Sequence, residues 1–174
     1  LPARAEEALA TLDALVCGAG IALPQQLVTD TSDDEWRRLM GIDLDGVFYT
    51  IRGAVPSFVR RRQGAIVTIS SMWGTVGASC EAAYSATKSG MNGLTKALAK
   101  ELAPSNVQVN AIACGVIDTA MNAQFSEEER EALREEIPAG RFADSEEVAA
   151  LALTLASGHS YLTGQIIGLD GGYI

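Results

Sequence analysis

Short apolar segments that alternate with helical stretches place the strongest constraint on how this chain can fold. Such segments span 13–17, 65–70 and 107–112, and a last one spans 164–170. The second, Ala-Ile-Val-Thr-Ile-Ser, is too apolar to face water on either side, which is typical of a strand covered on both faces. Apolar strands that alternate with helices form a parallel sheet with right-handed crossovers. The sequence therefore predicts an α/β fold with a doubly wound parallel sheet.

Helix signals fill the segments between these strands. Thr31 or Ser32, followed by Glu35, resembles a capping box that starts a helix. The helical stretch runs to about Arg62, in one piece or two, and Pro56 is expected to bend or interrupt it. Further helices are expected over 3–12, over 81–102, from residue 126, and from 144 to about 156.

Composition limits the classes of partner. A chain of 174 residues with 48% hydrophobic content can bury one substantial core, so we expect one domain over residues 1–174. The net charge of −9 argues against nucleic acid or an anionic membrane surface as a partner. The basic run 60–62 is expected to end a helix, where positive charge is favourable. No apolar run approaches the roughly eighteen residues needed to cross a bilayer.

The cysteines and the single histidine argue against metal and disulfide sites. Cys17, Cys80 and Cys114 form no C-x-x-C pair, and the histidine is His159. We therefore expect no metal, no disulfide scaffold and a reducing cytoplasm as the location. The chain shows no signal peptide, although a first residue of leucine leaves its natural start open.

A tyrosine, a lysine and a serine carry the chemistry. Tyr84 and Lys88 are four residues apart and share one face of the expected helix, and Ser71 follows the apolar strand upstream. An ammonium beside a phenol lowers the phenol pKa from about 10 towards neutrality. Tyr84 could then pass a proton to a carbonyl oxygen as hydride reaches the carbon, while Ser71 holds that oxygen. A tyrosine followed four residues later by a lysine occurs by chance in about one chain of this size in three.

Specificity comes from several segments in a fixed order. The segments are Cys17–Gly20, Asp43–Phe48, Ile69–Gly74, Tyr84–Gly90, Val109–Gly115, Thr163–Gln165 and Asp170–Gly172. Together they resemble the short-chain dehydrogenase/reductase family over nearly the whole chain. Within the family the chain is most similar to bacterial 3-oxoacyl-[acyl-carrier-protein] reductases. Residues 72–81 are also similar to relatives that reduce an aminopentanone modification on elongation factor P.

The resemblance implies a nicotinamide-dependent ketoreductase, with NADP(H) favoured over NAD(H). Ser71 would hold the substrate carbonyl, Tyr84 would be the general acid, and Lys88 would bind the nicotinamide ribose. The substrate would be a small carbonyl compound or one bound to a carrier protein. The full set of implied cofactor-binding residues is Cys17, Gly18, Ala19, Gly20, Ile69, Tyr84, Lys88, Gly115, Ile117 and Thr119.

The resemblance also implies a homodimer or tetramer and a mobile cover over the substrate. Residues 118–138 would be that lid, although a solvated acidic helix is an equally good interpretation of their composition. The helix 81–102 commonly lies between subunits in this family. Its apolar stripe fits such a contact or ordinary core packing, and consists of Met91, Leu94, Leu98 and Leu102.

Two features depart from the family pattern. The first three strands and the glycine-rich dinucleotide turn, roughly 70 residues, are not found, so we expect the C-terminal portion of a Rossmann fold. Gly18-Ala19-Gly20 is expected to be a tight strand-exit turn that does not replace the missing one. Without those strands the segment after Asp13 would be an exposed sheet edge. A rival hypothesis follows: a cofactor-free fragment or decayed paralogue that only self-associates.

Substitutions inside the motifs are a further departure. Asp43 stands where a fourth catalytic residue, an asparagine, normally supports a water in the proton relay. Its negative charge would raise the Tyr84 pKa and slow turnover near neutral pH. Cys17-Gly18 replaces two asparagines, and Cys114 replaces a proline before Gly115, so the loop towards the nicotinamide is expected to be looser.

Overall fold

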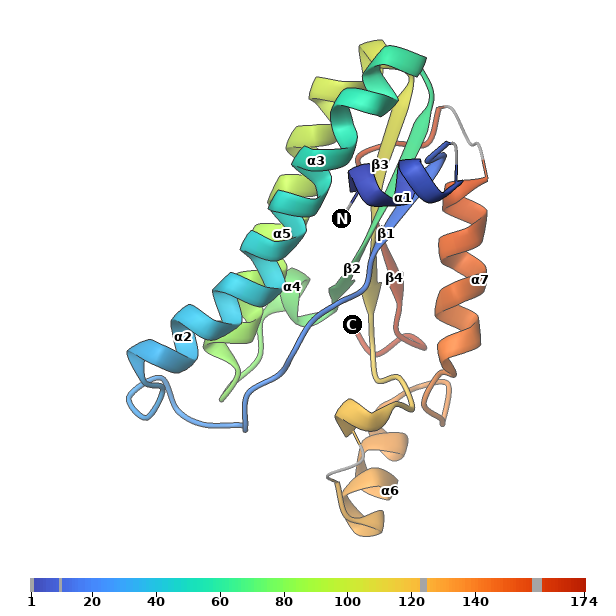
Figure 1. Ribbon diagram of the computed structural model, residues 1–174. Coiled ribbons are helices and arrows are strands. Elements are labelled where there is room, and N and C mark those ends of the chain that lie inside the picture. The colour runs from blue at the N-terminus through green and yellow to red at the C-terminus, as the bar shows by residue number, and fades with distance from the viewer. Residues whose placement is uncertain (1, 10, 123–124, 158–160) are drawn as a thin grey trace.

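Four parallel strands form one sheet in the part of the chain that the structure describes. The computed structural model describes residues 2–9, 11–122, 125–157 and 161–174, so His159 lies outside the described residues. The strands lie side by side in the order of the sequence, and every neighbouring pair is parallel (Figure 1). The predicted α/β class is confirmed. The strands are β1 (Ala14–Cys17), β2 (Gly64–Ser71), β3 (Val107–Cys114) and β4 (Ile166–Leu169).

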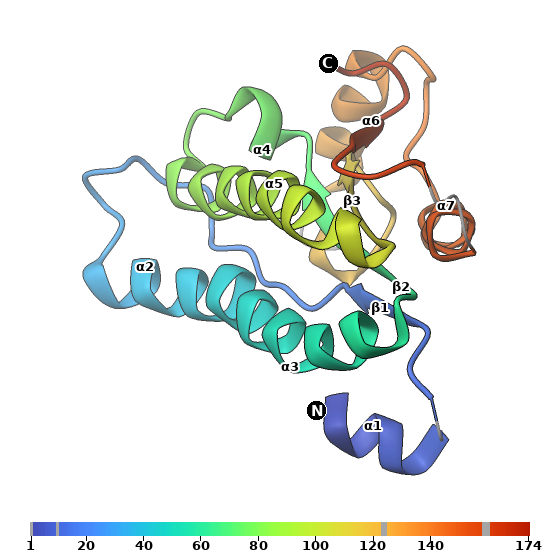
Figure 2. The same cartoon turned by 90° about the horizontal axis from the view of Figure 1, so that it is seen from above.

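Helices cover both faces of this sheet. Figure 2 shows α3 and α5 side by side on one face and α7 on the other. None of the described helices is both long enough and apolar enough to span a membrane. The helices are α1 (Pro2–Leu9), α2 (Asp33–Met40), α3 (Gly46–Arg61), α4 (Trp73–Val76), α5 (Ala82–Leu102), α6 (Glu127–Glu136) and α7 (Ser145–Ala156).

The core divides into two layers because successive strand residues point to opposite faces. Ile66 packs with Phe58 of α3 and Met91 of α5, whereas Val67 packs with Leu155 of α7. β2 is buried along almost its whole length, as its composition predicts. The stripe on α5 belongs to the first layer, where Met91 and Leu102 are buried and Leu94 and Leu98 pack against the same cluster. This packing resolves the two alternatives for the stripe in favour of the core.

Helix starts follow the predicted capping signals. Ser32 and Glu35 form a capping box at α2, since the Ser32 side chain accepts from the Glu35 N–H and the Glu35 carboxylate accepts from the Ser32 N–H. Ser126 begins α6 and Asp144 begins α7 in the same way. One boundary is wrong: α1 ends at Leu9, and the next described residues, which were expected to be helical, are not.

The interruption expected at Pro56 is not found. Pro56 lies inside α3, which continues unbroken to Arg61 because neighbouring residues of α3 are packed into the core. The division between α2 and α3 is instead a π-helical turn at Gly41–Asp45, and Asp43 is fully buried in that turn. Such turns often occur at functional sites, where they redirect one side chain from the helix.

Candidate active site

The ends of three neighbouring strands bring the candidate residues to one edge of the sheet. Ser71 is the last residue of β2 and pairs in register with Cys114, the last residue of β3. Gly18 follows β1, and Gly115 follows β3. In a parallel sheet these carboxyl ends meet at the same edge, which is where such folds bind ligands.

A buried ion pair lies behind this edge. The Lys88 Nζ atom is 3.4 Å from Oδ2 of Asp43, and it donates a hydrogen bond of 3.3 Å to the Ile69 carbonyl. Asp43 Oδ1 accepts from the Ile21 N–H at 2.9 Å. Asp43 Oδ2 is buried without a hydrogen bond, so its contact with Lys88 is one of charge and not of directed hydrogen bonding. Both side chains are almost completely shielded from water.

Tyr84 lies next to this pair, one helical turn before Lys88. The Lys88 Nζ atom is 5.3 Å from the centre of the Tyr84 ring. Burial raises the pKa of the Tyr84 phenol well above 10, and the charge of Asp43 raises it further, while a hydrogen bond with Ser71 acts in the opposite direction. The expected increase from Asp43 is therefore found. The expected net depression of the pKa is not found, because burial and the Asp43 carboxylate both raise it.

Ser71 is held in place by the backbone at the start of α4. Its Oγ atom accepts a 3.1 Å hydrogen bond from the Trp73 N–H. A hydroxyl that accepts at its oxygen can still donate its single proton to another acceptor. Ser71 can therefore donate to an oxygen placed next to Tyr84.

Two cavities meet at these residues. The larger, of about 410 Å³, contains Lys88 in its wall, and the smaller, of about 140 Å³, is bounded by α4, α6 and the C-terminal segment. The residues that line both cavities, and therefore separate them, are Ser71, Tyr84, Gly115, Met121 and Asn122. A molecule in either cavity would meet the same hydroxyl groups.

Most of the predicted cofactor residues line the larger cavity. They are Gly18, Gly20, Ile69, Tyr84, Lys88, Gly115, Ile117 and Thr119. The other two do not: Cys17 is packed in the core between the sheet and α3, and Ala19 is exposed. The reason is the alternation along β1, which turns Cys17 away from the cavity. Asp43 also lies outside the cavity walls, behind Lys88.

Gly115 and Gly74 allow the backbone to pass where a side chain would not fit. A Cβ atom on Gly115 would lie 2.6 Å from the Asp170 Cα atom, and one on Gly74 would lie 2.7 Å from the Lys88 carbonyl carbon. Asn92 and Ser89 both donate to the Gly74 carbonyl at 3.0 Å. These contacts fix α4 against α5 and so set the position of Lys88. Asn92 was not singled out from the sequence, although it lies one turn after Lys88 on the same face of α5.

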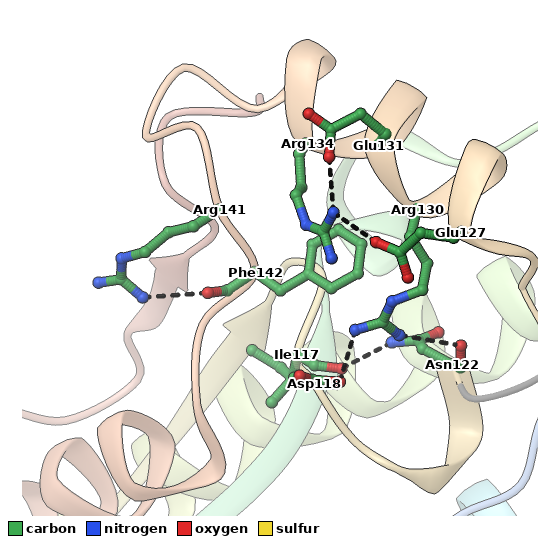
Figure 3. Close-up of polar contacts among 9 residues, drawn as sticks. All are labelled: Ile117, Asp118, Asn122, Glu127, Arg130, Glu131, Arg134, Arg141 and Phe142. Carbon is green, nitrogen blue, oxygen red and sulfur yellow. Dashed lines mark hydrogen bonds and ion pairs between the residues drawn. The ribbon is translucent and has the colours of Figure 1, made fainter.

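The segment expected to be a lid is braced by an ion pair within it and contacts the rest of the protein at Phe142. Arg130 of α6 forms a 2.9 Å ion pair with Asp118 and lies over the Phe142 ring at 4.9 Å (Figure 3). Asn122 donates to the Ile117 carbonyl at 2.8 Å. The turn that carries Ile117 is therefore mechanically connected to α6.

The smaller cavity contains groups that the sequence did not point to. Trp73 and Tyr173 form an edge-to-face pair with ring centres 5.9 Å apart, and the Tyr173 hydroxyl donates to Glu136 of α6. Glu81 lines the same cavity and accepts a 3.1 Å hydrogen bond from the Gln25 amide. Tyr173 is at the far end of the chain, so no local pattern could have placed it here.

Cysteines and acidic groups form no metal site in the described part of the chain. Among those residues no group of three or more His, Cys, Asp or Glu side chains could hold a metal ion. The three cysteines are free thiols. Burial raises the pKa of both the Cys17 and the Cys114 thiols to about 11, so each stays protonated at neutral pH.

A parallel sheet with helices on both faces and a Ser–Tyr–Lys group at its carboxyl edge defines a Rossmann-type protein of the oxidoreductase class. The family model described as "Enoyl-(Acyl carrier protein) reductase" matches residues 1–174. The protein therefore belongs to the short-chain dehydrogenase/reductase family.

Individual relatives agree with this family. The chain is 40% identical over 163 residues to the uncharacterised oxidoreductase YmfI of Bacillus subtilis, covering 93% of this chain and 67% of the relative. It is 43% identical over 164 residues to the 3-oxoacyl-[acyl-carrier-protein] reductase of Thermotoga maritima, covering 94% and 66%. The crystal structure of the corresponding Brucella melitensis reductase superposes with a TM-score of 0.91 at 36% identity, covering 100% of this chain and 68% of that one. The chain thus spans about two thirds of the length of its relatives.

Proposed function

We propose that the protein is an NAD(P)(H)-dependent ketoreductase, most like 3-oxoacyl-[acyl-carrier-protein] reductase, in which Tyr84 donates the proton. The observation that carries this proposal is the position of Ser71 and Tyr84 between two cavities. One cavity would hold the nicotinamide and the other the carbonyl substrate. The identity with named 3-oxoacyl-[acyl-carrier-protein] reductases supports the same activity.

The larger cavity fits the nicotinamide end of a dinucleotide. Ile69, Ile117 and Val148 give it apolar walls for a flat ring, and Lys88 and Thr119 supply polar groups. Lys88 would hold the ribose hydroxyls, and the turn at 115–119 would orient the carboxamide. When bound, the nicotinamide would supply hydride to the carbonyl carbon. The strands described here include no glycine-rich turn for the pyrophosphate.

The residues of the chain provide the proton and the orientation. The Ser71 hydroxyl donates to the substrate carbonyl oxygen and places it next to the Tyr84 hydroxyl. Tyr84 is protonated at neutral pH because its pKa is raised, and it transfers its proton to that oxygen as charge develops there. Apolar side chains around the smaller cavity, including Phe125 and Leu133, exclude water from the reacting atoms.

The direct test is oxidation of NADPH by the purified chain with acetoacetyl-coenzyme A, a soluble β-keto thioester. We expect loss of NADPH absorbance that depends on both reagents. Parallel reactions with NADH test the preference for NADP(H). Absence of turnover together with absence of NADPH binding, measured by quenching of Trp73 fluorescence, would favour the rival hypothesis of a cofactor-free, self-associating module.

A specific observation favours a second candidate function, the reduction of an aminopentanone group on elongation factor P. Glu81 is a carboxylate in the wall of the smaller cavity, and no Lys or Arg of the described residues forms an ion pair with it. Trp73 and Tyr173 present aromatic rings in the same wall. A carboxylate with aromatic rings suits a substrate ammonium group.

The two candidates are separated by Glu81→Gln. If the substrate carries an amine, we expect this variant to raise KM for an amino ketone and to leave KM for acetoacetyl-coenzyme A unchanged. Equal effects on both substrates would remove the support for the second candidate. For either function we also propose that the protein forms a homo-oligomer and acts on a carbonyl substrate in the cytoplasm.

A further inference from the structure

The proposed reaction does not by itself require the negative charge of Asp43 that is buried next to Lys88. Asp43 is completely buried in the π-helical turn, and one of its oxygens has no hydrogen bond. That oxygen is 3.4 Å from the Lys88 ammonium. A buried carboxylate without a directed partner is unfavourable unless a nearby charge compensates it. Lys88 supplies that charge, and in return its own charge is largely neutralised.

The packing around the pair fixes the carboxylate in place. Asp43 Oδ1 is held by the Ile21 N–H at 2.9 Å, and a Cβ atom on Gly20 would lie 3.0 Å from Oδ2. The loop after β1 therefore closes over Asp43, and Lys88 is the cation that pairs with it among the described residues. Lys88 is likewise restricted, because it donates to the Ile69 carbonyl at 3.3 Å.

The charged and titratable groups of the described residues that act on Tyr84 come from four places in the fold. Asp43 approaches from the π-helical turn, Lys88 lies on α5, Glu81 is the N-cap residue just before α5, and Cys114 lies at the end of β3. Cys114 is a neutral thiol at ordinary pH. Two carboxylates thus face the phenol, and among the described residues Lys88 is the cation placed next to it. The balance of charge around the phenol is negative.

We propose that Asp43 is a positioning residue whose charge neutralises Lys88 and so keeps the proton on Tyr84, holding the site in its carbonyl-reducing form up to alkaline pH. This inference rests on the proposed function for its catalytic meaning, but the charge coupling itself can be measured without catalysis. It differs from a water-supporting role, in which an uncharged side chain would serve equally well.

The sign of the effect follows from the role of Tyr84. Reduction needs the protonated phenol, so its rate falls as the pH rises through the Tyr84 pKa. Oxidation of the alcohol needs the phenolate, so its rate rises through the same pKa. Asp43 raises that pKa, and removal of its charge moves both limbs to lower pH.

The experiment is a titration of phenolate absorbance in the parent chain, Asp43→Asn and the control Asp45→Asn. Asp45 is an exposed carboxylate in the same π-helical turn, so its variant removes a matched charge without touching the buried pair. Subtracting the curve of the corresponding Tyr84→Phe protein from each isolates the Tyr84 signal from the other tyrosines. Asn keeps the size of Asp43 and can still accept from Ile21.

We expect Asp43→Asn to lower the Tyr84 midpoint by on the order of one pH unit, the lower end of shifts caused by a neighbouring charge. Asp45→Asn should leave it unchanged. An unchanged midpoint in folded Asp43→Asn, or an equal shift in Asp45→Asn, would overturn the proposal. If Asp43→Asn does not fold by circular dichroism, Asp43→Ser replaces it as a smaller uncharged variant. Failure of both to fold would show a purely structural role and would also overturn the proposal.

Kinetics then connect the titration to the reaction. The limb of the kcat profile that Tyr84 governs, which falls with pH for acetoacetyl-coenzyme A reduction and rises with pH for alcohol oxidation, should move to lower pH in both directions by the same amount as the Tyr84 midpoint. A shifted midpoint in a chain without any reductase activity would contradict the proposed function and leave the charge coupling standing. Limbs that do not move with the midpoint would overturn the catalytic part of this inference.

Discussion

Tyr84 is the residue on which the proposed chemistry depends most directly. Tyr84→Phe removes the hydroxyl and keeps the ring, so the ring still fills its place in the cavity wall. Because general acid catalysis typically contributes about 10²–10⁴-fold, we expect kcat to fall at least in that range while the thermal stability changes little. Steady-state rates at saturating NADPH measure this. A variant within tenfold of the parent would show that another group donates the proton.

Lys88 and Asp43 are expected to depend on each other for stability. Lys88→Met leaves the Asp43 carboxylate buried and unpaired, and breaking such a pair typically costs about 3–5 kcal/mol. The double variant Lys88→Met with Asp43→Asn removes both charges and should recover part of this loss. Urea unfolding of the parent, both single variants and the double variant gives the coupling energy. Strict additivity of the two substitutions would mean that the charges do not interact.

The spacing of Tyr84, Lys88 and Ser71 was enough to predict that these residues share one site, because helix periodicity and strand-end position are both local properties. The charge environment could not be obtained in the same way. The net direction of the Tyr84 pKa depends on how deeply the phenol is buried and on the contact between Asp43 and Lys88. Both are properties of the packed molecule.

At the scale of elements, Arg130 is one of the residues that hold α6 to the body. Arg130→Ala removes the ion pair with Asp118 and the contact with the Phe142 ring. Asp118 is half exposed, so we expect a loss of only about 1 kcal/mol of local stability, which corresponds to roughly fivefold faster amide exchange in α6. Hydrogen exchange followed by mass spectrometry measures this. Glu135→Gln, an exposed change on the same helix, is the control and should leave exchange unchanged.

The elements themselves were largely readable from the sequence, whereas the junction between α2 and α3 was not. Capping residues such as Ser126 and Asp144 act on the next few residues, so the starts of α6 and α7 could be predicted. The π-helical turn has no such local signal. It is stabilised by the burial of Asp43 against a lysine on α5, and the sequence pattern around Pro56 pointed to the wrong position.

At the scale of the whole molecule, β1 is one of the two edges of the described sheet. It pairs with β2 alone, and Val16 is 49% exposed on it. An open apolar edge can pair with another chain, so we expect this 174-residue chain to associate in solution. Because the described strands include no glycine-rich turn for the pyrophosphate, we also expect the chain to bind NADPH weakly. Val16→Lys places a charge on the edge and should shift the chain towards monomer in sedimentation analysis.

The matched control for this prediction is Ala132→Lys, which adds the same charge on an exposed position of α6. It should leave association unchanged. A monodisperse monomer of the parent chain with micromolar NADPH affinity would contradict the prediction directly. The relatives bear on the same point, because about a third of the length of each lies outside the part that this chain matches.

The parallel register of the sheet also determines how quickly such a molecule can form. Ala14 pairs with Ala65, and Ala111 pairs with Ile166, so each strand contact joins distant parts of the chain. Domains dominated by distant contacts fold more slowly than those built from local ones, because loop closure precedes any gain from pairing. Helix α5 can form early with Tyr84 and Lys88 already aligned. Lys88 gains its counter-charge only when the turn that carries Asp43 docks. We therefore expect the complete site to be among the last parts of the molecule to form.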